Sequence, residues 1–238
     1  MNREINTYDD LLSMLDQYSQ GIAWDAFYHT RSKPAPFIQQ NELPDESLME
    51  IIESLHPRKA LELGCGEGRN AIYMAQQGLE VTALDLSPVA IDHAESIAAR
   101  KGVSVQFQCA DALSFEAGGP YDLIYDSGML HHLAPHRRIT YRQQLQRLLS
   151  PGGFFGLTCF ASGDEDQHGA DAVDDWTYYQ EKRAGVSFTP QRLQQLFAPQ
   201  MDLIWIRKMR DGVPGAIQGL SFMWAALFRK DDGSASHI

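Results

Sequence analysis

The sequence predicts a doubly wound α/β fold, in which a mostly parallel sheet carries helices on both faces. Short apolar runs of strand length alternate along the chain with longer segments whose apolar residues recur at helical spacing. Turns that contain glycine or proline separate the two kinds of segment. Because parallel strands need a crossover connection, this alternation is typical of strands that are joined through helices.

The individual elements follow from local signals. We expect helices over residues 45–55, 69–78, 88–100, 135–149 and 190–197, and strands over residues 59–63, 79–84, 103–109, 121–125, 153–160, 201–209 and 219–228. Acids lie in the first turn of the first helix, Ser87 and Pro88 begin the third, and Gly78 and Gly102 end the second and third. Residues 211–215 contain two glycines and a proline, which predicts a hairpin between the last two strands.

Length and composition favour one domain. The chain has 238 residues, of which 44% are hydrophobic, and its net charge of -11 disfavours DNA or RNA as a partner. No basic start precedes an apolar run, and residues 220–228 are too short to span a bilayer, so we expect no membrane partner and a cytoplasmic location. Three cysteines without metal-ligand spacing are expected to be reduced. We expect a domain over 1–230 (cap segment 1–44, cofactor-binding core 45–160, substrate-side loop or cap 161–188, C-terminal helix and hairpin 189–230) and a disordered tail over 231–238.

A glycine-rich turn follows the first expected strand and predicts a nucleotide-type cofactor site. Gly64, Gly66 and Gly68 allow a tight turn and a close approach to a ligand. Asp85 ends the next strand, 21 positions after Gly64, about where a βαβ unit places an acid against ribose hydroxyls. Arg69 occupies the position of the third glycine in a dinucleotide fingerprint, which tells against a pyrophosphate ligand.

Four further segments, each at a strand end or a loop, follow the glycine-rich turn along the chain. Residues 81–88 end a strand at an acid, residues 108–112 do the same, residues 121–133 hold a strand and a loop, and residues 149–154 enter another strand. With the glycine-rich turn, these segments resemble the class I S-adenosylmethionine-dependent methyltransferases over roughly residues 45–160. The resemblance implies a Rossmann-like, seven-stranded sheet with an antiparallel C-terminal strand.

The resemblance also implies a cofactor, S-adenosyl-L-methionine, with S-adenosyl-L-homocysteine as its product. Glu62 would orient the amino-acid end of this cofactor, Asp85 would accept hydrogen bonds from its ribose, and Asp111 would help to hold its adenine. The expected cofactor-binding residues are Glu62, Gly64, Cys65, Gly66, Gly68, Asn70, Asp85, Leu86, Ser87, Ala110, Asp111, Ala112, Asp126, Ser127 and Gly128.

His131 and His132, after the fourth expected strand, are the candidate catalytic residues. Either ring could accept a proton near neutral pH, or the pair could position or pack without acting as a base. A methyl group on a sulfonium is already activated, so alignment and exclusion of water can suffice. The expected reaction is direct in-line transfer to a small-molecule nucleophile, and S, Se, Te, O and N acceptors are all open.

Two segments outside the strand pattern, residues 20–37 and 161–176, are expected to cover the site. Ligand contacts gather beyond the carboxyl ends of parallel strands, and both segments are long and contain aromatic residues. The aromatic spacing of the first segment suits core packing as well as a ligand clamp. This segment loosely resembles that of bacterial thiopurine and tellurite-resistance methyltransferases. The expected substrate-side residues are Trp24, Tyr28, Arg31, Phe37, Trp176 and Tyr179.

Two alternatives stay open. An NAD(P)-dependent oxidoreductase could use a similar sheet, although Arg69 and residues 149–154 disfavour it. A non-catalytic S-adenosylmethionine-binding regulatory protein would keep the site without transferring a methyl group. No carboxylate and histidine set shows a metal-ligand pattern, so no metal is expected, and His136 and His168 are the residual candidates. A monomer and a homodimer both fit the sequence.

Overall fold

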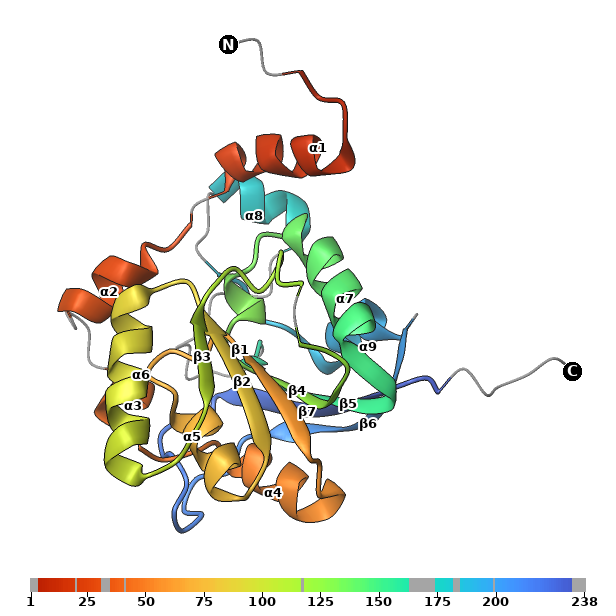
Figure 1. Ribbon diagram of the computed structural model, residues 1–238. Helices are drawn as coiled ribbons and strands as arrows, with labels where there is room; N and C mark the ends of the chain where they lie inside the picture. Colours follow the sequence, from red (N-terminus) through yellow and green to blue (C-terminus); the bar gives the residue numbers. More distant parts are fainter. Residues whose placement is uncertain are drawn as a thin grey trace, which may run out of the picture.

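The computed structural model describes residues 4–19, 21–30, 35–40, 42–116, 118–162, 174–181, 185–198 and 200–232. Within these ranges a seven-stranded sheet has the order β3-β2-β1-β4-β5-β7-β6, with helices on both faces (Figure 1). The expected tail over 231–238 lies largely outside the described residues.

The strands run as the sequence predicts, with small shifts at their ends. Their bounds are β1 Lys59–Leu63, β2 Glu80–Asp85, β3 Gln106–Cys109, β4 Tyr121–Ser127, β5 Leu149–Phe160, β6 Met201–Lys208 and β7 Met223–Lys230. Strands β1 to β5 pair in parallel, whereas β7 is antiparallel to both β5 and β6. The predicted mostly parallel sheet with an antiparallel C-terminal strand is therefore confirmed.

The helices of the core also match their expected ranges closely. The bounds are α1 Tyr8–Leu15, η1 Asp16–Tyr18, α2 Trp24–Thr30, α3 Pro36–Gln39, α4 Glu46–Leu55, α5 Arg69–Gln76, α6 Pro88–Lys101, η2 Leu130–His132, α7 Arg137–Leu148, α8 Asp175–Glu181 and α9 Pro190–Phe197. Ser87 caps α6 by accepting a hydrogen bond from the N–H of Ala90 (3.2 Å), and Thr189 does the same for α9. No helix within the described ranges is long and apolar enough to cross a membrane.

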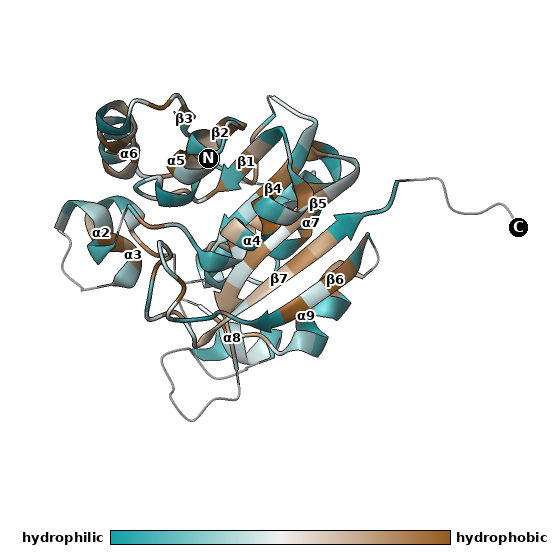
Figure 2. Cartoon of the chain, turned by 90° about the horizontal axis from the view of Figure 1, so that it is seen from below, coloured by the Kyte–Doolittle hydropathy of each residue, from teal (hydrophilic) through white to brown (hydrophobic). Residues whose placement is uncertain are grey.

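The sheet separates two hydrophobic cores, because successive residues of a strand face opposite sides. On one face Leu61 packs in a cluster with Tyr141 of α7 and Phe197 of α9. On the other face Ala60 packs in a cluster with Met74 of α5. Figure 2 shows the apolar character of the central strands that both cores share. Because both faces of the strands are buried, the strands cannot shift along one another. The loops at their carboxyl ends, which form the site, are therefore held in position.

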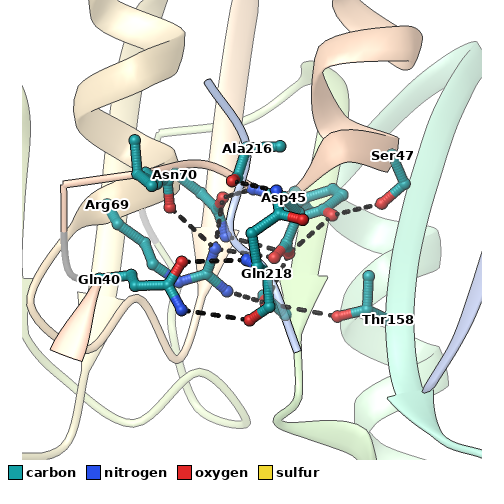
Figure 3. Close-up of polar contacts among 11 residues, drawn as sticks. Gln40, Asp45, Ser47, Arg69, Asn70, Thr158, Ala216 and Gln218 are labelled. Carbon is teal, nitrogen blue, oxygen red and sulfur yellow. Dashed lines mark hydrogen bonds and ion pairs between the residues drawn. The ribbon is translucent and has the colours of Figure 1, made fainter. Parts of the chain in front are cut away.

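The segment between β6 and β7 folds back onto the N-terminal region. The backbone N–H of Gln218 donates to Oε1 of Gln40 (3.0 Å), and Nε2 of Gln40 donates to the carbonyl of Gln218 (3.2 Å; Figure 3). The N–H of Ile217 donates to the carbonyl of Pro44 (2.9 Å). The segment before β7 makes these contacts and does not pair in the sheet, and β7 begins at Met223 and not at the expected position 219.

Candidate active site

A cavity of about 940 Å³ opens beyond the carboxyl ends of the parallel strands. Its wall includes Glu62 of β1, Asp85 of β2, Ser127 of β4 and Phe160 of β5. The order of the sheet reverses between β1 and β4, and open α/β sheets bind ligands at such a switch point. The cavity therefore lies where the sequence places the cofactor site.

The glycine-rich turn forms the floor of the cavity. Gly64, Gly66 and Gly68 have φ angles of 66°, 53° and 80°, in the left-handed region that side chains rarely adopt. A Cβ built on Gly66 would lie 2.5 Å from the hydroxyl oxygen of Tyr28, a residue of α2. Gly64 and Gly66 line the cavity, and the backbone at Gly66 packs directly against the Tyr28 hydroxyl.

Asp85 is almost completely buried at the end of β2. Its Oδ2 accepts from the N–H of Gly66 (2.8 Å) and its Oδ1 accepts from the N–H of Ser87 (2.9 Å). Burial raises the pKa of Asp85 above its ordinary value, and the N–H donors oppose that shift. Each carboxylate oxygen can accept more than one hydrogen bond, so this residue can hold the turn and a pair of hydroxyl groups together.

Glu62 lines the same cavity and has a buried carboxyl group. The carboxyl group is 1% exposed, and its Oε2 has no hydrogen-bond partner within the described part of the chain. Burial raises the pKa of Glu62 to about 8, while the charge of Arg69 and a hydrogen bond from Asn70 lower it. A buried carboxyl oxygen without a partner, on a residue of the cavity wall, is available to accept a hydrogen bond.

Arg69 belongs to a buried polar cluster behind the turn (Figure 3). Its guanidinium lies 2.7 Å from Oδ1 of Asp45, which is fully buried. The hydroxyls of Tyr125 and Ser127 donate to Oδ2 of Asp45 at 2.9 and 2.7 Å, and the backbone N–H of Asp45 donates to Oδ1 of Asn70 at 2.9 Å. The cluster links α4, α5 and β4 beside the glycine-rich turn.

Asp126 supports the wall from behind. The N–H groups of Met129 and Leu130 and the hydroxyl of Tyr141 donate to its carboxyl group at 2.6, 3.0 and 2.5 Å. Burial raises the pKa of Asp126 to about 7, against these donors. This residue fixes the turn that carries Ser127 into the wall.

The two histidines form one hydrogen-bonded unit. The N–H of Phe160 donates to Nδ1 of His131 (3.3 Å), so the ring proton of His131 sits on Nε2, which lies 3.0 Å from Nε2 of His132. His131 also stacks on the ring of Phe160, with centres 3.7 Å apart. Burial, and then the neighbouring His132, lowers the pKa of His131 well below its ordinary value. Burial therefore favours the neutral form of the His131 ring.

Helix α2 covers the cavity from the side of β2. Tyr28 is 6% exposed, and burial, followed by the nearby charge of Asp85, raises its pKa well above the ordinary value. The hydroxyl of Ser87 donates to Oδ1 of Asp25 (2.9 Å), which fastens α2 to the start of α6. The expected cover by residues 20–37 thus agrees with the placement of α2 and of Phe37, while Arg31 lies outside the described residues.

The opposite side of the cover differs from expectation. Residues 163–173 of the expected segment 161–176 are outside the described part of the chain. Trp176 and Tyr179 lie on α8 and not in the cavity wall; Trp176 is 80% exposed, and Tyr179 hydrogen-bonds His136 (2.5 Å) beside α7 and α1 (Figure 1). Ion pairs between Asp175 and the arginines of α7 and α9 hold α8 there.

Most expected site residues meet at the cavity. Among them the wall contains Trp24, Tyr28, Phe37, Glu62, Gly64, Cys65, Gly66, Asn70, Asp85, Leu86, Ala110, Asp111, Ala112, Ser127, Gly128, His131 and His132. The other three expected residues lie behind this wall. Gly68 and Ser87 are the N-caps of α5 and α6, and Asp126 accepts the hydrogen bond from the N–H of Met129.

Part of the wall lies within the expected cover 20–37 but was not named residue by residue: Ile22, Ala23, Ala26, Phe27, Thr30, Ala35 and Pro36. Sequence reasoning missed the rest of the wall, which is formed by Glu67, Arg69, Leu84, Met129, Leu133, Phe160, Leu220, Phe222 and Met223. Phe160 could have been found as the last residue of a strand that ends at the cofactor edge. Within the described ranges, no three histidine, cysteine or acidic side chains are placed to hold a metal ion.

Residues 60–153 match the profile of a family described as "Methyltransferase domain". This range runs from β1 into β5 and includes the glycine-rich turn, Asp85 and both histidines. Over residues 60–153 the chain is therefore similar to the class I methyltransferase family. The resemblance drawn from the order of the motifs is confirmed, and the cavity lies on the loops of this methyltransferase domain.

The alignment with one similar protein is longer than the methyltransferase domain. The 2-heptyl-1-hydroxyquinolin-4(1H)-one methyltransferase of Mycobacteroides abscessus is 32% identical over 152 residues, 62% of this chain and 65% of that protein. The matches span 52% to 65% of the length of the first three curated relatives.

Two solved structures share the fold. The 1,6-didemethyltoxoflavin-N1-methyltransferase of Burkholderia thailandensis has a TM-score of 0.63 at 22% identity, covering 98% of this chain and 94% of that one. TehB from Haemophilus influenzae has a TM-score of 0.58 at 16% identity, covering 77% and 61%.

Proposed function

We propose that the protein is an S-adenosylmethionine-dependent methyltransferase that acts on a small molecule by direct in-line displacement. Bound S-adenosylmethionine supplies a methyl group on a positively charged sulfur, already activated toward nucleophiles. The residues of the chain bind and orient both reactants and exclude water from the cavity. A cavity of about 940 Å³ is near the top of the roughly 300–1,000 Å³ range of small-molecule sites, which suits a cofactor and a substrate together.

The unsatisfied Oε2 of Glu62 carries this proposal. The amino-acid end of S-adenosylmethionine bears an ammonium group, whose three donors would satisfy that oxygen. Asp85 would accept the ribose hydroxyls, and the turn around Gly66 lets the backbone come close to the ligand. Asp111 and the neighbouring backbone of Ala112 would hold the adenine at the edge of the wall.

We assign different roles to the two histidines. Both ring nitrogens of His131 are engaged, and its ring is buried, so His131 is a positioning residue for His132. His132 is half-buried in the wall, and its Nε2 accepts the proton of His131, so it is a candidate base for an oxygen or nitrogen acceptor only when this hydrogen bond breaks. A sulfur, selenium or tellurium acceptor would need only the orientation that the wall provides.

The alternatives receive less support. An NAD(P)-dependent oxidoreductase would need room for a pyrophosphate at the turn, where Arg69 is instead buried against Asp45. A non-catalytic regulatory protein would bind S-adenosylmethionine without consuming it, so turnover of cofactor with a labelled methyl group over a metabolite panel separates it from an enzyme.

The wider context of the protein is also a proposal. The net charge of -11 argues against nucleic acid as the substrate. Cys65, Cys109 and Cys159 are all unpaired, which supports a reducing compartment and hence the cytoplasm. We propose that residues 1–230 act as one domain, as a monomer or a homodimer.

Cofactor affinity should depend on pH through Glu62. The group is protonated below its pKa of about 8, whereas a bound ammonium group favours the carboxylate. Binding therefore releases a proton, and affinity should rise up to about tenfold per unit between pH 6 and 8. Calorimetry with S-adenosylhomocysteine in two buffers should show net release of a proton at pH 7. Glu62→Gln should lose this release; a variant that keeps it would show that Glu62 does not meet the ligand.

Asp85→Ala should weaken S-adenosylhomocysteine binding roughly 10- to 100-fold, because hydrogen bonds to a carboxylate contribute about 1.5–3 kcal/mol. Asp122→Ala is the matched control: its Oδ2 also accepts from two backbone N–H groups, those of Arg58 and Lys59, but at the opposite edge of the sheet. Calorimetry should show unchanged affinity for the control. Equal losses in both variants would remove Asp85 from the binding site.

A further inference from the structure

Aromatic side chains follow one another around the cavity without a break. The centre of Phe27 lies 6.0 Å from that of Phe37 and 5.7 Å from that of Trp24. Trp24 lies 4.9 Å from His132. All these spacings are those of interacting aromatic pairs. The succession starts on α2 and α3 and crosses to η2.

The succession continues on the other side of the cavity. His132 lies 4.2 Å from His131, which stacks on Phe160, and Phe160 lies 6.1 Å from Phe222. We call this set the aromatic belt; its members are Trp24, Phe27, Phe37, His131, His132, Phe160 and Phe222, and all of them line the cavity.

The belt is supported from behind. Phe37, Phe160 and Phe222 pack against the cluster of Met209, Ile217, Leu220, Met223 and Ala225. Every belt residue except His131 is only half-buried, so part of each ring surface stays accessible. Rings that are packed on one side and accessible on the other form a preorganised surface for stacking, which core packing alone does not require.

We propose that the belt binds a planar aromatic substrate, and that flat ring systems rather than aliphatic acids or saturated molecules are the acceptors of this protein. This rests on the proposed function for the transfer itself, but not for binding. Aromatic pairs gain stability beyond the apolar area that they bury, and ring faces on several sides of one cavity select a flat partner. The wall from α2 to the segment before β7 then sets specificity, while Glu62 and Asp85 serve the cofactor.

The test uses 2-naphthol as the probe and decahydro-2-naphthol, its saturated counterpart, as the comparison. Titration of the full chain, with and without S-adenosylhomocysteine, should give at least threefold tighter binding of 2-naphthol. Trp24→Leu and Phe222→Leu should each weaken 2-naphthol binding roughly 2- to 10-fold and leave the S-adenosylhomocysteine affinity unchanged. Trp24→Phe, which keeps a ring, should bind like the wild type.

Tyr18→Leu serves as the control, because Tyr18 is 60% exposed on η1 and lies outside the cavity wall. Equal affinity for the two naphthol probes, or a Trp24→Leu variant with unchanged 2-naphthol affinity, would overturn the proposal. If the wild-type chain binds S-adenosylhomocysteine but does not prefer 2-naphthol over decahydro-2-naphthol, only the proposed role of the aromatic belt is contradicted. A wild-type chain that binds 2-naphthol but not S-adenosylhomocysteine contradicts only the proposed function.

Discussion

Gly66→Val is expected to weaken S-adenosylhomocysteine binding by more than about 100-fold. The backbone of Gly66 has φ of 53°, and a Cβ there would lie 2.5 Å from the hydroxyl oxygen of Tyr28. A β-branched residue can relieve both problems only if the turn moves. The N–H of Gly66 donates to Asp85, so a moved turn also releases the residue that we expect to hold the ribose.

Two variants separate the causes of this loss. Gly78→Val meets the same backbone strain, with φ of 88°, but finds nothing within 4 Å, so it should lower stability and spare affinity. Gly66→Ala combined with Tyr28→Phe removes the nearest atom and leaves a contact of 3.4 Å to Cζ, so it should be more stable than Gly66→Ala alone. Calorimetry measures affinity and thermal unfolding measures stability. Normal affinity in Gly66→Val would show that the cofactor does not approach this turn.

The fold could be predicted from the sequence because its signals are local. Helix α9 and strand β1 have the expected bounds, since a cap or a glycine marks their ends. The carboxyl ends of parallel strands share one edge of the sheet, so Glu62, Asp85 and Ser127 were expected to meet there. The parallel arrangement of their strands is sufficient to predict that these three residues lie close together.

Other parts of the site depend on contacts between distant segments. Gln40 and Gln218 lie 178 positions apart, and nothing near either residue predicts their pairing or the entry of Phe222 into the wall. Trp176 is an aromatic residue at the end of the expected covering segment, but the ion pairs of the preceding Asp175 hold its helix, α8, beside α7 and α9. Composition therefore favours a cover formed by both segments, whereas tertiary contacts place α2 in the cavity wall and α8 outside it.

Asp45 is a further case in which context overrides the local signal. The sequence presents it as an ordinary acid at a helix start, and Arg69 as a missing glycine. In the structure Asp45 has no exposed surface, and Arg69 is 8% exposed. Burial opposes the charge of Arg69, but Asp45 overcomes this effect, so the pKa of Arg69 rises. The two residues form a buried ion pair directly behind the cofactor loop.

Asp45→Ala should therefore destabilise the protein by about 3–5 kcal/mol, because it leaves a buried cation without its partner. For a chain of this length that corresponds to a fall in melting temperature of roughly 6–20 °C. Glu42→Ala is the matched control, since its ion pair with Arg100 is 49% and 61% exposed and should contribute at most about 1 kcal/mol. Thermal and urea unfolding measure both variants.

The decisive comparison is the double variant Asp45→Ala with Arg69→Met. If the loss in Asp45→Ala comes from an unpaired buried charge, removing that charge should restore a large part of the stability. If the loss comes from the hydrogen bonds that Tyr125 and Ser127 make to Asp45, the double variant will be no more stable than the single one. Recovery of stability without recovery of S-adenosylhomocysteine affinity would then show that Arg69, held by Asp45, contributes to the shape of the cofactor loop as well as to the fold.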